Sequence, residues 1–319
     1  MRCLITGATG FVGRHLAVAL RAAGHECVGL ARDRGPLDIP VHTADLADTA
    51  ATEAVLRDVR PEWLFHLAGY ADNGRSYKEP DQAWAGNLAA TRSLYDAVAR
   101  TDLRPRILYV SSGLVYGDAG PGEHVCTEET PLKPASPYAA SKAAADLLSY
   151  QQTRSPGLDV VRVRPFNQVG PGQSADYAAA NFARQVAAVE RGQAAHVEAR
   201  GDLSARRDLT DVRDMVKAYI RLLEVGQTGE VYNAGSGRTY RMQEILDRLV
   251  ALAGVPVTVQ ERPDASRKAD AAVSRADIRK LREATGWQPA ISLDQTLADM
   301  LADWRRRLEV RPSSSSSAR

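Results

Sequence analysis

The chain has 319 residues, 44% of them hydrophobic and 25% charged, with a formal net charge of +2. These values are typical of a globular protein with one large domain or two smaller ones. The scattered charges give no reason to expect a nucleic acid or an anionic membrane as partner, and no apolar run approaches the roughly 18 residues of a membrane span.

The amino-terminal stretch predicts a strand, a glycine-rich turn and a helix. The strand covers Arg2 to Thr6, Gly7, Gly10 and Gly13 follow, and the helix runs toward Gly24. Glycines at this spacing bring backbone amides and a helix N-terminus up to a pyrophosphate, although the more familiar spacing is Gly-x-Gly-x-x-Gly. We therefore expect a dinucleotide site here. A folded strand at the start also argues against a signal peptide and for a cytoplasmic location.

Strands and helices then alternate. We expect strands at 26–30, 41–43, 63–67, 107–110 and 160–163, and helices at 50–59, 81–100 and 137–154. Such alternation predicts a doubly wound parallel α/β sheet, in which ligands bind at the carboxyl ends of the strands. The residues expected at those ends are Thr6, Asp45, Ala68, Ser112 and the run from Pro165 to Asn167.

The pattern loosens after Asn167. Helices are expected at 178–191, 212–225, 241–253 and 293–308, and a strand at 231–233 that returns to the main sheet. We expect a dinucleotide-binding domain at 1–166, with 208–236 returning to it. A smaller C-terminal α/β substrate domain would use 167–207 and 237–308, and 309–319 would be a disordered tail.

Cysteine and histidine usage indicates neither a disulfide framework nor a metal site. The three cysteines and six histidines show no ligand spacing. Cys3 and Cys27 fall inside expected strands, where cysteine usually fills the core. We therefore expect no metal.

Ser112, Tyr138 and Lys142 provide an acid–base device for a carbonyl/alcohol pair. Tyr138 and Lys142 are four residues apart in a run of helix formers, so they share a helix face. A nearby ammonium favours the phenolate and is expected to lower the tyrosine pKa. Ser112 follows a strand and can hold a substrate oxygen near that phenol. A Tyr-x-x-x-Lys alone often marks only a solvated helix face, and the glycine-rich start is what supports the catalytic interpretation.

Taken together, these motifs resemble the extended short-chain dehydrogenase/reductase family, whose members act on nucleotide sugars. The resemblance covers residues 1 to about 308 and implies a Rossmann fold with Ser112, Tyr138 and Lys142 as a catalytic triad. The cofactor-binding residues that it implies are Gly7, Gly10, Phe11, Val12, Gly13, Asp45, Leu46, Leu67, Ala68, Gly69, Tyr138, Lys142 and Pro165.

The resemblance also implies a homodimer built from the helices at 81–100 and 137–154. The apolar residues available for this contact are Ala85, Leu88, Leu94, Leu147, Leu148 and Tyr150. The same residues could instead face the sheet.

The residues after the second strand bear on the choice of cofactor. An NAD enzyme usually places a carboxylate there for the ribose 2′-hydroxyl, whereas this chain has Ala31 followed by Arg32. A guanidinium suits a 2′-phosphate, which favours NADP(H). The neighbouring Asp33 leaves NAD(H) possible, and Arg32 as a plain surface residue is the alternative.

Two loops, 164–174 and 205–214, resemble those of GDP-4-keto-6-deoxy-D-mannose reductases. The chain departs from them at Gln168, where they usually have histidine, and at Leu114, where they commonly have aspartate. The substrate-binding residues that the resemblance implies are Ser112, Gly113, Asn167, Arg207 and Arg267, with the two guanidinium groups on the diphosphate.

Leu114 also bears on the type of reaction. Sugar 4,6-dehydratases carry an acidic residue at this slot, and a leucine cannot do acid–base work. We expect an NADPH-dependent reductase of a nucleotide-linked 4-keto-6-deoxy sugar, with GDP-4-keto-6-deoxy-D-mannose giving GDP-D-rhamnose. A UDP-hexose 4-epimerase is the rival, and a 4,6-dehydratase or a non-catalytic NADP-binding regulator are further alternatives. The nucleotide base and the stereochemistry at C4 stay open.

Overall fold

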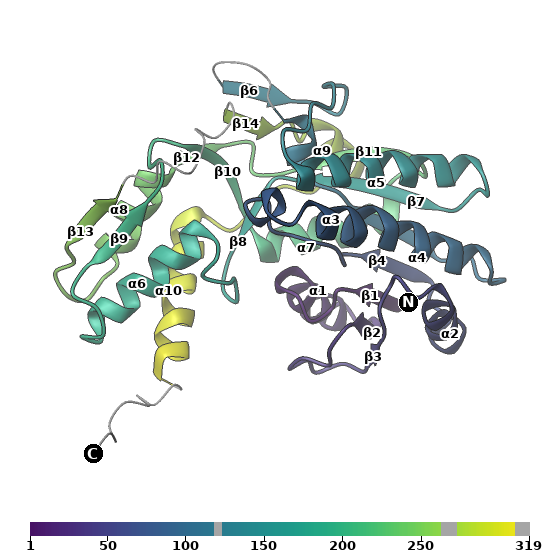
Figure 1. Cartoon of the computed structure of the whole chain (residues 1–319), viewed down its shortest axis with the longest axis horizontal. Helices are drawn as coiled ribbons and strands as arrows, with labels where there is room; N and C mark the ends of the chain where they lie inside the picture. Colours follow the sequence, from purple (N-terminus) through teal and green to yellow (C-terminus); the bar gives the residue numbers. More distant parts are fainter. Residues whose placement is uncertain (118–122, 263–272, 310–319) are drawn as a thin grey trace.

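A computed structural model describes residues 1–117, 123–262 and 273–309 (Figure 1). Its centre is a seven-stranded parallel sheet, which confirms the predicted fold class. The strand order is β11-β7-β5-β4-β1-β2-β3. The topological switch point therefore lies between β1 and β4, and doubly wound sheets bind ligands at such a point. The strands are β1 (Arg2–Thr6), β2 (Glu26–Ala31), β3 (Val41–Thr43), β4 (Trp63–His66), β5 (Arg106–Val110), β7 (Val160–Pro165) and β11 (Val231–Ala234).

Helices cover both faces of this sheet. On one face α1 (Phe11–Ala22) and α7 (Val212–Val225) pack on a core that includes Ile5. On the other, α2 (Thr49–Val59) and α4 (Ala90–Ala99) pack on a core that includes Leu4. Neighbouring strand residues thus point to opposite cores, which explains why the strands read as continuous apolar runs. Cys3 and Cys27 are both buried in the first core, as predicted.

The expected helix at 81–100 is interrupted. It consists of α3 (Pro80–Trp84), a π-helical turn η2 (Ala85–Ala89) and α4. Such turns occur often at functional sites because the extra residue redirects the side chains of the helix. Here Asn87 lies inside η2 and is 1% exposed.

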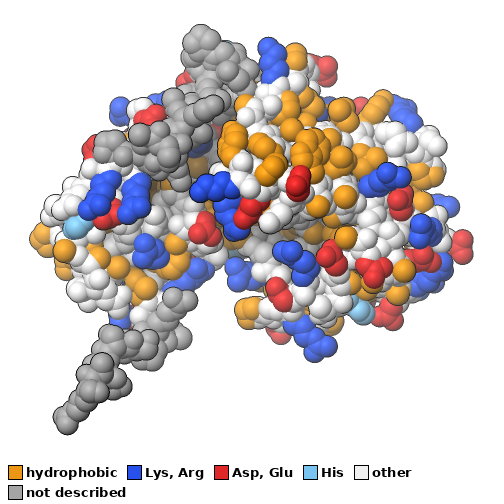
Figure 2. Space-filling model, in the orientation of Figure 1, with side chains coloured by type: hydrophobic (Ala, Val, Ile, Leu, Met, Phe, Trp, Pro, Cys, Tyr) orange, Lys and Arg blue, Asp and Glu red, His pale blue; other side chains and the backbone are white. Residues whose placement is uncertain are grey.

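Beside α4, α5 (Pro137–Arg154) carries Tyr138 and Lys142. Its outer surface stays apolar, with Leu147 58% exposed and Tyr150 38% exposed. Figure 2 shows hydrophobic side chains gathered over the region of α3 and α5.

A second group of elements lies beside the main sheet (Figure 1). Three helices, α6 (Ala178–Glu190), α8 (Met242–Ala251) and α10 (Leu293–Glu309), share one apolar core. The sequence analysis predicted none of the short strands of this group. They are β8 (Asn167–Val169), β10 (Arg206–Asp211) and β12 (Thr239–Arg241) in one sheet and β9 (Val197–Arg200) with β13 (Val259–Arg262) in another.

The remaining short elements lie near the main sheet. Strands β6 (Glu123–Cys126) and β14 (Val273–Ala276) pair with each other, and α9 (Arg279–Thr285) packs against α7. Two 3-10 turns are η1 (Arg75–Tyr77) and η3 (Gly113–Tyr116). Of the expected tail at 309–319, only Glu309, the last residue of α10, lies within the described residues.

Within the described ranges, no helix combines the length and apolarity needed to cross a bilayer. In the same ranges, no group of three or more His, Cys, Asp or Glu side chains is placed to hold a metal ion.

Candidate active site

Ser112 and Tyr138 meet where β5 ends and α5 begins. Ser112 is the second residue after β5, and its Oγ accepts a hydrogen bond of 3.2 Å from the Leu114 amide. The start of α5 is fixed by Ser136, whose Oγ accepts from the Ala139 amide at 3.1 Å. This cap presents Tyr138 in the first turn of the helix, where its phenol lies close enough to Ser112 for that side chain to lower the Tyr138 pKa.

The protonation states at this point differ from the sequence-based prediction. Burial raises the pKa of Tyr138 to about 12, although the Ser112 side chain lowers it. Burial also lowers the pKa of Lys142 to about 8, against the opposing effect of Asp146. The prediction of a lowered Tyr138 pKa is therefore wrong for this structure, because desolvation of the phenolate by burial is the largest effect on that pKa. Tyr138 is a proton donor at neutral pH.

Lys142 is held in place by the backbone of β5. Its Nζ donates to the Val110 carbonyl at 2.9 Å and lies 5.5 Å from the centre of the Tyr109 ring. The ammonium therefore points to the carboxyl end of β5, on the same side of the sheet as Ser112.

A chain of hydrogen bonds, which sequence reasoning missed, joins the carboxyl ends of β1 and β4. Thr91 donates to the Asn87 carbonyl at 2.5 Å, so its oxygen accepts from His66 Nε2 at 2.9 Å. His66 Nδ1 then accepts from Thr6 Oγ1 at 2.8 Å, and that oxygen accepts from the Ala68 amide at 3.1 Å. Burial lowers the His66 pKa to about 3, so this neutral imidazole fixes the strand ends without adding a charge.

The absence of a side chain at Gly69 leaves room for Asn87 and Lys142. A Cβ at position 69 would lie 2.5 Å from Asn87 Oδ1 and 3.6 Å from Lys142 Nζ. Asn87 Nδ2 donates to Ser141 Oγ at 2.9 Å, whereas Asn87 Oδ1 is buried and has no partner among the described residues. Because buried polar atoms are rarely left unpaired, this oxygen marks the site as built to bind a polar group.

The glycine-rich turn fits a dinucleotide. Gly7 has a φ of +69°, and a Cβ there would lie 2.9 Å from the Ala68 backbone. A Cβ at Gly13 would lie 2.4 Å from the Gly7 carbonyl. Gly10 is the N-cap of α1 and supplies no side-chain cap, so the first amides of α1, beginning at Phe11 and Val12, are available to phosphate oxygens.

The predicted adenosine-contacting residues lie at the far side of this turn. Arg32 and Asp33 follow β2 and are exposed, and Arg32 has no ion pair within the described part of the chain. Asp45 is exposed and accepts from the Ala47 amide at 3.0 Å, while Leu46 is buried. The Arg32 guanidinium, after β2, and the Asp45 carboxylate, after β3, are thus both at the surface.

The predicted substrate residues are only partly brought together. Asn167 donates to the Asp208 carbonyl at 3.1 Å, and Arg207 donates to the Arg206 carbonyl at 2.7 Å, so both belong to the sheet of β8, β10 and β12. Gly113 is buried under Phe166, whose ring would lie 2.8 Å from a Cβ at position 113. Arg267 lies outside the described residues.

The remaining predicted residues lie at or near the carboxyl ends of β4 and β7. Pro165 ends β7, and Leu67 follows β4 and packs against the first core. Tyr177, which sequence reasoning missed, precedes α6 and donates to the Ala71 carbonyl at 3.4 Å. Tyr177 also raises the pKa of Tyr138 by its charge interaction with the phenol, an effect smaller than that of burial.

Comparison with known proteins points to one family. The model of the family described as "NAD dependent epimerase/dehydratase family" matches residues 3–235. Among curated proteins, the chain is 34% identical to GDP-6-deoxy-D-mannose reductase of Pseudomonas aeruginosa, over 96% of this chain and 98% of that protein. It is also 30% identical to UDP-glucose 4-epimerase of Mycolicibacterium smegmatis, over 96% and 99% of the two chains.

Solved structures give the same picture. The structure of RMD from Pseudomonas aeruginosa complexed with NADPH matches with a TM-score of 0.85 and 34% identity, over 96% of this chain and 100% of that chain. The UDP-glucose 4-epimerase of Thermus thermophilus in complex with NAD matches with a TM-score of 0.85 and 28% identity, over 96% and 99%.

Proposed function

Because the chain belongs to the NAD dependent epimerase/dehydratase family and is an NAD(P)-dependent oxidoreductase, we propose that it reduces the 4-keto group of a nucleotide-linked 4-keto-6-deoxy sugar with NADPH. The observation that carries this proposal is a protonated Tyr138 beside Ser112, at the carboxyl end of β5. The substrate would be GDP-4-keto-6-deoxy-D-mannose, and the product GDP-D-rhamnose. The similarity to the Pseudomonas aeruginosa reductase supports this choice of sugar.

The proposed chemistry assigns one task to each residue. NADPH, when bound, supplies the hydride for the sugar C4. Ser112 holds the C4 oxygen, and Tyr138 donates its phenolic proton to the alkoxide that forms there. The pKa of Lys142, lowered to about 8, leaves most of it protonated at pH 7, so its ammonium stabilises the phenolate that remains. We propose that Lys142 also holds the cofactor ribose.

We propose the following cofactor- and substrate-binding roles from the positions of these residues in the fold. The turn of Gly7, Gly10 and Gly13 would hold the pyrophosphate, and Asp45 with Leu46 the adenine. Asn167 and Arg207 would contact the nucleotide sugar from the neighbouring sheet. Leu67, Ala68, Gly69 and Pro165 would line the cofactor at the strand ends.

The experiment that tests this proposal is NADPH oxidation over GDP-, dTDP-, UDP- and CDP-linked 4-keto-6-deoxy sugars. The GDP-linked sugar should be reduced fastest. GDP-mannose should stay unchanged, because Leu114 follows Ser112 where proton removal would need an acidic side chain. Formation of a 4-keto-6-deoxy product from GDP-mannose would identify a dehydratase instead.

A nucleotide-sugar 4-epimerase is the second candidate, favoured by the similarity to UDP-glucose 4-epimerases. An epimerase returns the hydride to the sugar and so retains its NAD through purification. A reductase must exchange its cofactor every turnover. Tightly bound NAD, together with conversion of UDP-glucose to UDP-galactose, would overturn the reductase proposal.

Cofactor choice should depend on Arg32. Replacing Arg32 by alanine is expected to weaken NADPH binding by about 1.5–3 kcal/mol, roughly 10- to 150-fold in Kd, because a charged hydrogen bond to the 2′-phosphate is lost. NADH binding should barely change. Titration by cofactor fluorescence measures both.

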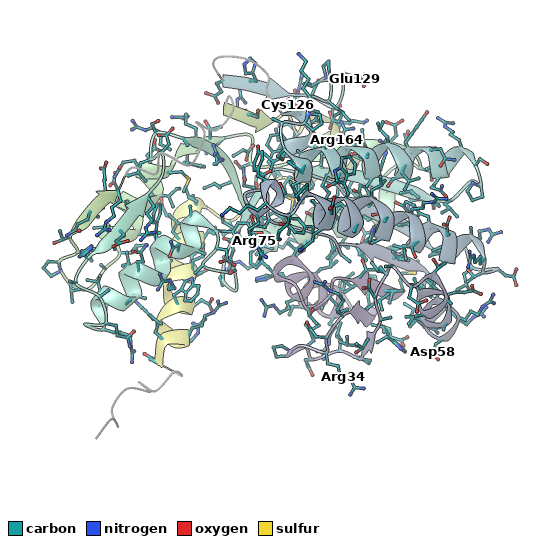
Figure 3. All side chains as sticks on the ribbon, in the orientation of Figure 1. Arg34, Asp58, Arg75, Cys126, Glu129 and Arg164 are labelled. Carbon is teal, nitrogen blue, oxygen red and sulfur yellow. The ribbon has the colours of Figure 1, made fainter. Side chains whose placement is uncertain are left out.

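Arg34 provides a matched control for this variant. It lies two residues further along and points away from the protein (Figure 3). Arg34→Ala should therefore bind both cofactors like the wild type. Equal losses of NADPH and NADH binding in Arg32→Ala would mean that Arg32 does not read the phosphate.

We propose a homodimer that buries the outer surfaces of α3 and α5. Of the residues considered for this contact, Leu94 is fully buried against the sheet, whereas Leu147 and Tyr150 are exposed, as is Trp84 at 39%. A glutamate at position 147 would place a charge in the dimer contact, so Leu147→Glu should yield a monomer.

Light scattering at micromolar concentration measures this outcome. Val18→Glu is the control, because Val18 is 70% exposed on α1 and belongs to a different surface. It should leave the dimer intact. A monomeric wild-type protein would contradict the proposed homodimer.

A further inference from the structure

Four buried polar atoms without a hydrogen-bond partner among the described residues come from one region. They are Gln168 Oε1, Gln173 Oε1, Thr210 Oγ1 and the Tyr219 hydroxyl. Gln173, Thr210 and Tyr219 are each less than 5% exposed. Most buried polar side chains are hydrogen-bonded. Several buried atoms without a hydrogen-bond partner in one region therefore indicate a binding site for a polar group.

These four residues are connected through β8, β10 and α7. Gln168 lies opposite Thr210 in the parallel pairing of β8 with β10. Gln173 Nε2 donates to the Gln168 carbonyl at 2.9 Å. The Gln168 amide also lies beside the Tyr219 phenol, where burial raises the pKa of Tyr219 and Gln168 opposes that rise. Gln168 is therefore the centre of the cluster.

The cluster lies close to the proposed point of hydride transfer. Gln168 lies three residues beyond Pro165, the last residue of β7, and β7 pairs with β5, whose carboxyl end leads to Ser112. Hydride leaves C4 of the nicotinamide ring, and the carboxamide is attached to the adjacent ring carbon. A cofactor that delivers hydride to an oxygen-bearing carbon held by Tyr138 and Ser112 must therefore place its carboxamide near the same residues.

A carboxamide and the Gln168 side chain are chemically complementary. Each is a planar amide with two N–H donors and one carbonyl acceptor. Gln168 Oε1 is an unused acceptor, and the neighbouring Tyr219 hydroxyl is likewise unpaired among the described residues, so it is available to orient the Gln168 amide. Both groups are neutral, so binding would not require a buried charge.

We propose that Gln168 binds the carboxamide of the nicotinamide ring, with its Oε1 accepting a hydrogen bond from the carboxamide N–H, and that Tyr219 orients the Gln168 amide. Gln168 is then a positioning residue, which sets the face and rotation of the ring relative to Tyr138. This inference rests on the proposed function only in requiring a nicotinamide cofactor, and it does not depend on which sugar is reduced.

The test compares NADP⁺ with its 3-acetylpyridine analogue, which keeps the carbonyl and lacks the N–H donors. Dissociation constants are measured by calorimetry without any sugar. Wild-type protein should bind the analogue about 5- to 50-fold more weakly than NADP⁺, the effect of leaving a buried acceptor unpaired. Gln168→Leu should bind both compounds equally within about twofold, because the acceptor that distinguishes them is gone.

Two further variants complete the experiment. Gln295→Leu changes an exposed glutamine on α10 and should keep the wild-type discrimination. Tyr219→Phe keeps the ring and removes only the hydroxyl, so it should reduce the discrimination in part. This variant keeps the inference testable if Gln168→Leu does not fold, which its circular dichroism spectrum reports.

The outcomes separate this inference from the proposed function. Wild-type discrimination retained in Gln168→Leu would overturn the role of Gln168 and leave the reductase proposal intact. Normal discrimination in a wild type that reduces no nucleotide sugar would overturn the reductase proposal and support Gln168. A wild type that binds neither dinucleotide would overturn both.

Discussion

Replacing Tyr138 by phenylalanine is expected to slow sugar reduction by about 10²–10⁴-fold, the usual contribution of a general acid. The phenol is the proton donor for the new alcohol, and burial keeps its pKa near 12, so it is fully protonated where the assay is run. The ring itself remains, so NADPH should bind with an unchanged Kd. Single-turnover NADPH oxidation and a separate cofactor titration measure the two quantities.

Tyr150→Phe is the matched control, because Tyr150 lies on the same helix, three turns beyond Tyr138. Its hydroxyl accepts a hydrogen bond from Arg154 at the surface and should not affect the rate. A Tyr138→Phe variant that keeps more than about a third of the wild-type rate would contradict general-acid catalysis by this residue. A loss of NADPH affinity matching the loss of rate would instead indicate a structural role.

The sequence predicted the central sheet well because the signals there are local. Apolar runs such as Trp63 to His66 need only their own composition to be recognised as buried strands. The glycine-rich turn was recognisable for a similar reason, since Gly7 and Gly13 occupy positions where any Cβ would collide with backbone atoms.

Features that depend on distant parts of the chain were not predictable in this way. Strands β6 and β14 pair across about 150 residues of sequence and are too short to show alternation. The π-helical turn at η2 gives no compositional signal, yet it buries Asn87 beside Gly69. The pKa of Tyr138 was predicted in the wrong direction because sequence spacing indicates a neighbouring charge but not the depth of burial.

Asp146→Ala is expected to cost about 3–5 kcal/mol of unfolding free energy, the range for a buried ion pair that loses one partner. Asp146 lies one turn after Lys142 and is fully buried. Its Oδ1 accepts from Arg162 at 2.6 Å, and its Oδ2 accepts from Arg164 at 3.0 Å. Figure 3 labels Arg164 beside α5 and below Cys126. Alanine would leave two buried guanidinium groups without their carboxylate.

The ion pairs of Asp146 should also make the free energy of unfolding depend on pH. Burial alone would raise the pKa of Asp146, but Arg164 and Arg162 outweigh it and the pKa lies below its usual value. A carboxyl group whose folded pKa is depressed stabilises the fold above its unfolded pKa of about 3.9 and loses that contribution as the pH falls through the folded value. Wild-type stability should therefore fall toward pH 3 more steeply than that of Asp146→Ala.

Urea denaturation of three variants separates the charge from the packing. Asp96→Ala removes an exposed partner of Arg92 on α4 and should cost less than about 1 kcal/mol. Replacing Asp146, Arg162 and Arg164 together by apolar residues of similar volume should recover much of the loss, because no buried charge then remains unpaired. If Asp146→Ala were as stable as Asp96→Ala, the two arginines would have to be neutralised by water or by other side chains. In that case Asp146 would not hold α5 against β7, and the positions of Tyr138 and Lys142 on α5 would not depend on it.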